Sequence, residues 1–356
     1  MKKLLLIIIT MLVLVSCKEE TLKIGLVTTL TGSNSEIGIA IRDSLLLKVN
    51  EVNDNGGVNG RKVEVIIRDD KNDHSLIKLY NDELFELGVD VYWGYELSSK
   101  YVAIEDFLKN DVVVISPTLS SHTLSGKNDN FFRTISTNWD QGETLAKHAN
   151  RDKKKSLILY DAKNKAYADG IMEGYENVFL GESTRLAVDN LLESESLIMD
   201  AYENSDSVIL IFNPIDCATV AQLFYKNDIR TQLYSSPWGM ISDSYKSAGK
   251  AMEGTVFASH IGDKTYQPYV EFVNKYKAYY NEEPQFAAVY SYEAAMMFFE
   301  AVDGLKEITY TGIKEGLLDL EELQGVISIL EFDDYGDIER KNYTAVLING
   351  ELITTE

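Results

Sequence analysis

Short apolar runs recur along the chain, and most are bounded by Gly, Asn or Asp. Each run has four or five residues, mostly β-branched or aliphatic, which is typical of strands buried on both faces of a parallel sheet. The runs lie at residues 24–27, 63–67, 89–92, 112–115, 157–160 and 208–212.

Amphipathic segments separate these predicted strands. The clearest one places Ile37, Ile41, Leu45, Val49 and Val52 at spacings of four, four, four and three, which forms one face of a helix. We expect this helix to end before the glycine pair at 56–57, because glycine readily adopts the left-handed conformation that ends helices.

The last third of the chain has longer elements. Residues 268–280 and 285–302 predict long helices, and residues 326–332 and 344–348 predict strands. No internal repeat and no low-complexity linker interrupts the pattern. Alternation of strand and helix over most of the chain predicts an α/β fold with right-handed crossovers.

Residues 1–16 have the pattern of a secretory signal. A basic start precedes an apolar run at 4–15, which is too short to span a bilayer comfortably. The run ends Leu14-Val15-Ser16-Cys17, which resembles a bacterial lipobox. We expect cleavage before Cys17, lipidation of Cys17, a tether at 17–21, and an extracytoplasmic protein anchored at the periplasmic face or cell surface. The alternative is an uncleaved N-terminal anchor with an incidental Cys.

Composition narrows the classes of partner. The 356 residues include 34 Lys and Arg against 56 Asp and Glu, a formal net charge of −22. This charge argues against nucleic acid and anionic lipid surfaces, because its long-range field repels phosphates. The content of 45% hydrophobic and 25% charged residues is typical of a globular protein, and this length suggests two domains or one large one.

The common catalytic and cofactor-binding motifs are missing. The chain has no Gly-x-Ser-x-Gly, His-Glu-x-x-His, Cys-x-x-Cys or Walker-type loop, and its four His residues are widely separated. The paired carboxylates at 69–70 and 333–334 are interpreted as solvated turns rather than as acid–base or metal sites. We therefore expect no catalytic residue, no metal and no cofactor.

Two loops that follow predicted strands are rich in hydroxyl groups. Residues 94–99 read Gly-Tyr-Glu-Leu-Ser-Ser before a helical stretch from Lys100, and residues 116–121 read Ser-Pro-Thr-Leu-Ser-Ser. Ligands of open parallel sheets bind beyond the carboxyl ends of the strands, and helix N-termini with nearby hydroxyls hold carboxylates. The alternative is that Ser98 or Ser99 simply caps the helix.

These segments occur in an order that resembles the branched-chain amino-acid class of type I periplasmic binding proteins. The resemblance spans nearly the whole chain after the signal. It rests on a series of short segments at 31–32, 55–61, 69–70, 94–99, 115–117, 132–134, 140–142, 167–170 and 332–337.

The resemblance implies two doubly wound parallel-sheet lobes joined by three crossover strands. Lobe 1 would comprise residues 22–137 plus 260–330, and lobe 2 residues 138–259 plus 331–356. It also implies a monomer that captures a small carboxylate-bearing ligand, in our interpretation an amino acid, by hinge closure for the permease subunits of an ABC importer. The alternative is a ligand-sensing receptor subunit of the same fold.

The resemblance further suggests which residues contact the ligand. Ser98, with its neighbour Ser99, and Ser120 would supply hydroxyl contacts, and Thr118 its backbone carbonyl. Tyr167 would reach the ligand from lobe 2.

One turn departs from the family pattern. Leucine-type relatives carry Gly-Pro-Glu-Gly, whose carboxylate pairs with the ligand ammonium, whereas residues 236–239 read Ser-Pro-Trp-Gly. Trp238 can stack on a flat ligand or make a cation–π contact. Asp216 is a second candidate for the ammonium, its alternative being a helix N-cap. Glu96 is expected to be a solvated loop charge and Ile37 a core residue.

Overall fold

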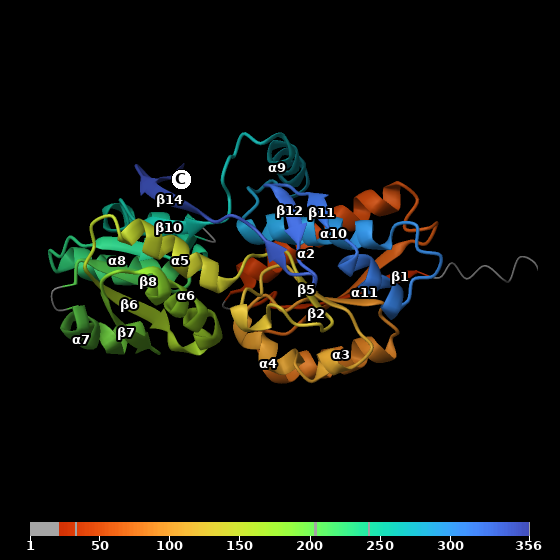
Figure 1. The fold of residues 1–356 in the computed structure, drawn as a ribbon, viewed down its shortest axis with the longest axis horizontal. Coiled ribbons are helices and arrows are strands. Elements are labelled where there is room, and N and C mark those ends of the chain that lie inside the picture. Colours follow the sequence, from red (N-terminus) through yellow and green to blue (C-terminus); the bar gives the residue numbers. More distant parts are fainter. Residues whose placement is uncertain (1–20, 33, 203–204, 241–242, 356) are drawn as a thin grey trace, which may run out of the picture.

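Two α/β lobes make up the protein (Figure 1). The computed structural model describes residues 21–32, 34–202, 205–240 and 243–355. The predicted signal at 1–16 and the predicted lipidation site Cys17 lie outside these residues. Within them, no helix is both long and apolar enough to cross a bilayer. The expected class, two lobes each built on a largely parallel sheet, is confirmed.

Lobe 1 contains a five-stranded parallel sheet in the order β2-β1-β3-β4-β5. Its strands are β1 (Leu22–Thr28), β2 (Val63–Asp69), β3 (Val91–Gly94), β4 (Val114–Ser116) and β5 (Phe131–Arg133). Helices cover both faces, so the central strands β1, β3 and β4 are mostly apolar, whereas the edge strand β2 carries Glu64, Arg68 and Asp69. One face carries α2 (Ser35–Asp54) and α10 (Phe286–Val302), and the other carries α3 (His74–Glu86) and α4 (Tyr101–Ile104). The helices α9 (Gln267–Tyr280) and α11 (Tyr310–Leu318) pack against α2 and α10, respectively.

Lobe 2 contains a seven-stranded sheet in the order β15-β14-β10-β9-β8-β6-β7. The strands are β6 (Lys155–Asp161), β7 (Glu182–Val188), β8 (Ser207–Ile211), β9 (Gln232–Ser235), β10 (Val256–Ser259), β14 (Tyr343–Ile348) and β15 (Glu351–Thr355). Pairing is parallel from β7 to β10 and antiparallel for β14 and β15.

Alternate residues of the β6 and β8 strands face different helix layers of lobe 2. Ile158 and Ile209 belong to the core with α5 (Asn138–Ala149) and α6 (Lys165–Val178). Leu157 and Val208 point the other way, into the core with α7 (Leu191–Tyr202) and α8 (Pro214–Lys226). This alternation is the period-two geometry of a strand that is buried on both faces.

A small antiparallel sheet of β11 (Glu322–Gln324), β12 (Ile329–Phe332) and β13 (Ile338–Glu339) lies beside α10 (Figure 1). The expected division between lobes at 330 and 331 falls inside β12. Residues up to Glu339 stay with lobe 1 because β12 and β13 pair with each other there, and the chain joins the sheet of lobe 2 at β14.

The chain crosses between lobes three times. The crossover segments are residues 134–137 after β5, residues 260–266 after β10, and residues 340–342 after β13. Each lobe is therefore assembled from segments far apart in the sequence, and the space between the lobes is bordered by all three crossovers.

Close packing of α5 against α6 determines where the first turn of α6 lies relative to this space. A Cβ atom on Gly174 would lie 2.2 Å from the carbonyl oxygen of Trp139, so the two helices approach to a distance that only glycine allows. Tyr167, in the first turn of α6, is thereby held at the boundary between the lobes.

Candidate functional site

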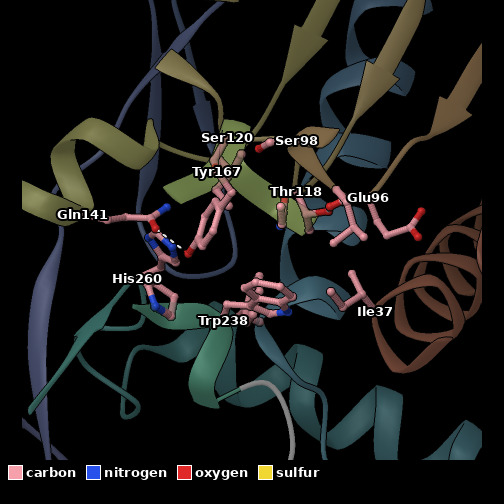
Figure 2. Close-up of a pocket in the computed structure, with 14 residues that line it drawn as sticks. Ile37, Glu96, Ser98, Thr118, Ser120, Gln141, Tyr167, Trp238 and His260 are labelled. Carbon is pink, nitrogen blue, oxygen red and sulfur yellow. Dashed lines mark hydrogen bonds between the residues drawn. The ribbon is translucent and has the colours of Figure 1, made fainter. Parts of the chain in front are cut away.

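A cavity of about 30 Å³ lies where the two lobes meet (Figure 2). This volume is far below the ~300–1,000 Å³ that is typical of small-molecule sites, so the walls of the two lobes lie close together around it. Lobe 1 and the crossovers contribute Ile37, Glu96, Leu97, Ser98, Thr118, Ser120, Ile135, His260 and Phe286, and lobe 2 contributes Gln141, Asn164, Tyr167, Pro237 and Trp238.

Five of the predicted contact residues line this cavity: Ser98, Thr118, Ser120, Tyr167 and Trp238. The other two, Ser99 and Asp216, line a larger and more polar neighbouring cavity of about 590 Å³. The two cavities share Leu97, Asn164 and Trp238 as walls. Loops that are far apart in sequence therefore meet around one cavity.

The hydroxyl groups of Ser98 and Ser120 are buried and have no hydrogen-bond partner among the described residues. Capping does not use Ser98, because Leu97 holds the N-cap position of the short 3₁₀ helix Ser98–Lys100 and no side chain caps it. The capping interpretation of Ser98 is therefore wrong. A buried polar group without a partner is costly, so both hydroxyls are available to a ligand.

The helices that follow these loops are shorter than the sequence predicted. The segment after Ser98 is one 3₁₀ turn joined to the four-residue α4, and the segment after Ser120 is the 3₁₀ turn His122–Leu124. A macrodipole requires many aligned peptide groups, so such turns contribute little positive potential. On this wall of the cavity, the hydroxyl groups are therefore the groups suited to bind a carboxylate, and the helix dipoles contribute little.

Glu96 is not the solvated charge that the sequence suggested. Its side chain is buried and binds the equally buried ammonium of Lys100 at 2.6 Å, while Lys100 also binds Asp70 at 2.6 Å and Thr29 at 2.9 Å. The hydroxyl of Thr28 donates to the second Glu96 oxygen at 2.9 Å. Figure 2 shows the Glu96 carboxylate pointing away from Tyr167 and Trp238.

The solvated-turn interpretation is also wrong for Asp70, which is completely buried in this network. Burial, together with the Glu96 charge, raises the pKa of Asp70. Burial acts in the same direction on Glu96, but Lys100 and hydrogen bonds outweigh it and lower the pKa of Glu96. Asp69 and Asp333, by contrast, accept backbone N–H groups in turns.

Hydrogen bonds hold the lobe 1 loops to each other and to lobe 2. The Thr118 hydroxyl donates to the carbonyl of Glu96 at 2.9 Å. Asn138, the first residue of α5, donates its backbone N–H to the Ser120 carbonyl at 2.8 Å and its side-chain amide to the Tyr167 carbonyl at 2.8 Å. Ser120 and Tyr167 are therefore placed on opposite walls by one shared residue.

Aromatic side chains form the lobe 2 wall. The Tyr167 and Trp238 rings meet edge to face, 5.7 Å apart and at 88°. The Tyr167 hydroxyl donates to Gln141 Oε1 at 2.8 Å, and burial raises the Tyr167 pKa. Trp238 Nε1 and Asn164 Oδ1 are buried and have no partner among the described residues. This wall combines flat apolar surface with one unused donor and one unused acceptor.

Asp216 is not the N-cap of α8. Asn213 holds that position, accepting the Asp216 N–H at 3.0 Å and donating its amide to the Asp216 carboxylate at 2.7 Å. Burial raises the pKa of Asp216. Among the described residues, Glu96 is the one acidic residue that lines the smaller cavity, and Lys100 already pairs with it.

Sequence reasoning missed several lining residues, notably His260, Asn164, Gln141 and Phe286. His260 and Asn164 each follow a strand of the lobe 2 sheet, which is the signal that could have found them. Burial lowers the pKa of His260 to about 3, so its imidazole is neutral. Among the described residues, no group of three or more His, Cys, Asp or Glu is placed to hold a metal ion.

We predict that Lys100→Met lowers the free energy of unfolding by about 3–5 kcal/mol, because it leaves two buried carboxylates without their counter-charge. Chemical denaturation at neutral pH measures this change. Lys109→Met is the matched control: Lys109 also pairs with an aspartate, Asp106, but both side chains are exposed, so a change within about 0.5 kcal/mol is expected. Equal effects in the two variants would contradict the assigned role of Lys100.

Comparison with known proteins places the chain in a family. The family model described as periplasmic binding protein matches residues 21–341. The Leu/Ile/Val-binding protein homolog 1 of Brucella suis is 23% identical over 331 residues, which cover 90% of this chain and 88% of that protein. The leucine-, isoleucine-, valine-, threonine- and alanine-binding protein of Pseudomonas aeruginosa is 29% identical over 160 residues, so this chain spans less than half (42%) of that relative.

Solved structures share the fold. The substrate-binding protein LivJ from Streptococcus pneumoniae, in complex with isoleucine, superposes with a TM-score of 0.83 at 21% identity, covering 94% of this chain and all of that one. A solute-binding protein of an ABC transporter from Rhodopseudomonas palustris, in complex with 3,4-dihydroxybenzoic acid, gives 0.81 at 20% identity, covering 94% and 96%. The chain belongs to the periplasmic binding protein family, as an extracytoplasmic solute-binding protein and not an enzyme.

Proposed function

We propose that this protein captures a small carboxylate-bearing molecule, with an amino acid as the first candidate, between its two lobes and delivers it to an ABC importer. The observation that carries the proposal is the pair of buried, unpartnered hydroxyls of Ser98 and Ser120 on one wall of the cavity. A carboxylate accepts from both without requiring a Lys or Arg. Ser98 and Ser120, with the carbonyl of Thr118, are the proposed polar contacts in lobe 1.

The remaining walls suit an apolar or aromatic body. Ile37, Ile135 and Phe286 are apolar lining residues, and Tyr167 and Trp238 add flat ring surface from lobe 2. Ile37 is a core residue, as expected, and also reaches the cavity. Burial of a ligand's apolar surface against these groups contributes about 25 cal/mol to the binding free energy for each Å² that is removed from water.

The ligands bound by two structural neighbours agree with this chemistry. Isoleucine in the Streptococcus pneumoniae protein and 3,4-dihydroxybenzoic acid in the Rhodopseudomonas palustris protein both carry a carboxylate on an apolar or aromatic body. An ammonium group, if present, would contact the Trp238 ring by a cation–π interaction of about 0.5–2 kcal/mol. Asp216 and Ser99, which line the neighbouring cavity, would act only on a ligand that extends into it.

Closure about the three crossovers is the proposed mechanism, with no covalent chemistry. The ligand first meets the hydroxyl loops of lobe 1. Contacts with Tyr167 and Trp238 then form only when lobe 2 approaches, so the ligand favours the closed state by its extra affinity for it. A monomer is sufficient for this cycle, because both walls come from one chain.

Calorimetric titration tests the proposal directly. Residues 17–356, unfolded and refolded to remove bound ligand, are titrated with the neutral amino acids and with a series of substituted benzoates. We expect micromolar or tighter binding of at least one carboxylate, and none of its primary amide. A folded, ligand-free sample that binds no carboxylate would contradict the proposed function.

We predict that Ser120→Ala weakens binding of the identified carboxylate by about 1–3 kcal/mol, because a buried hydrogen bond to a charged group is lost. Ser121→Ala is the control, since Ser121 is the next residue of the same loop but bonds Thr123 and does not line the cavity. Affinity is measured by the same titration. Equal losses in both variants would show that loop stability, and not ligand contact, is affected.

We also propose that Cys17 carries a lipid anchor, on the strength of the lipobox-like segment 14–17. Wild-type protein expressed from the full chain should partition into the membrane fraction and into detergent, with a mature N-terminus at Cys17 by mass spectrometry. Cys17→Ser should release it into the aqueous fraction. Membrane retention of the Cys17→Ser variant would contradict the proposal.

A further inference from the structure

The three crossovers are linked to one another through side chains at the back of the cavity. Each crossover contributes one residue: Ser136, His260 and Asn342. The Ser136 hydroxyl lies 3.4 Å from His260 Nδ1 and donates to Asn342 Oδ1 at 3.1 Å. Ser136 and His260 are both buried.

This arrangement determines where the imidazole hydrogen sits. A serine hydroxyl has one hydrogen, and that of Ser136 is used by Asn342 Oδ1. Toward His260, therefore, Ser136 Oγ acts as an acceptor, and Asn342 Oδ1 is likewise an acceptor. With Asn342 in this orientation, the ring hydrogen is assigned to Nδ1 of His260.

Only one hydrogen is present on the ring. Burial, reinforced by the positive charge of Arg340, lowers the pKa of His260 to about 3, so the imidazole is neutral. A neutral imidazole with its hydrogen on Nδ1 has a free lone pair on Nε2. Nε2 is thus an acceptor, not a donor.

No described residue satisfies that acceptor. Nε2 of His260 is buried without a hydrogen-bond partner, and His260 lines the ligand cavity close to Gln141 and Tyr167 (Figure 2). The rings of Tyr290 and Phe286 hold the imidazole in place, at centroid distances of 5.3 and 6.1 Å. The acceptor is therefore fixed in orientation and unoccupied by protein.

We infer that Nε2 of His260 accepts a hydrogen bond from an N–H or O–H group of the ligand. This inference rests on the proposed function and narrows its ligand class: besides the carboxylate that Ser98 and Ser120 receive, the ligand carries a hydrogen-bond donor, as an amino acid or a hydroxy acid does. A plain carboxylic acid without such a donor leaves Nε2 buried and unpaired, which reduces its affinity.

Matched ligand pairs test this specificity. Leucine is compared with 4-methylpentanoate, and 4-hydroxybenzoate with benzoate, so that each pair differs by one donor group. In at least one pair we expect the donor-bearing member to bind wild type about 5- to 10-fold more tightly, the size of one buried hydrogen bond. Equal affinities in every pair of which both members bind would overturn the inference.

Two substitutions test the roles of the two nitrogen atoms of His260 separately. His260→Asn retains a polar group near the position of Nδ1, toward Ser136 and Asn342, but removes the acceptor at Nε2. His260→Gln places an amide oxygen near the position of Nε2. We expect the preference for the donor-bearing ligand to disappear in His260→Asn and to be largely retained in His260→Gln. A preference that persists in His260→Asn would overturn the inference.

The tautomer can be measured without knowing the ligand. In protein labelled with ¹⁵N-histidine, we expect His260 to show a protonated Nδ1 and an unprotonated Nε2 between pH 5 and 8. A hydrogen on Nε2 would overturn the inference even if carboxylates bind. Failure of every carboxylate to bind would overturn the proposed function instead. In that case the measured tautomer would still show whether Nε2 of His260 is an acceptor.

Discussion

The buried ammonium of Lys100 is the constraint on which the ligand-facing edge of lobe 1 depends. It binds Thr29 after β1, Asp70 after β2 and Glu96 after β3. An uncompensated charge at this depth costs several kcal/mol, so the ends of three parallel strands are held together. The bond from Thr118 to the Glu96 carbonyl adds the loop after β4. Both hydroxyl-bearing loops are consequently placed by contacts that involve no ligand.

The two walls of the cavity present different chemical groups to the proposed ligand. Lobe 1 offers preorganised polar groups at Ser98 and Ser120, and lobe 2 offers the rings of Tyr167 and Trp238. His260 lies between them on a crossover and faces both the cavity and the other two crossovers. Under the proposed mechanism of closure, a ligand that donates to His260 also contacts a crossover, which connects the chemistry of the ligand to the closed state.

Much of the fold could be predicted from local patterns. Buried central strands such as β6 and β8 contain continuous apolar runs, α2 has apolar residues at helical spacing, and α10 is apolar over nearly its whole length. The strand β7 was not predicted, because it lies at an edge and most of its side chains are partly exposed or exposed. Its sequence lacks the apolar run that identifies central strands.

The site could be predicted only in part, for a related reason. The hydroxyls of Ser98 and Ser120 stand out because they follow strands in one short segment each. The burial of Glu96 depends on Lys100 and Asp70, and the role of His260 depends on Ser136 and Asn342, which are 124 and 82 residues away from it. Pairing between such distant positions leaves no local signal in a single sequence.

The position of β14 has a consequence for how the chain folds. The lobe 2 sheet pairs β10, which ends at Ser259, with β14, which begins at Tyr343 on the far side of a lobe 1 segment. Contacts of such long sequence separation form slowly, because a large loop must close first. During synthesis, the exposed edge of β10 stays unpaired until nearly the whole chain has emerged. That delay keeps the polypeptide loosely folded for longer, which suits a protein that must be threaded through a membrane before it folds.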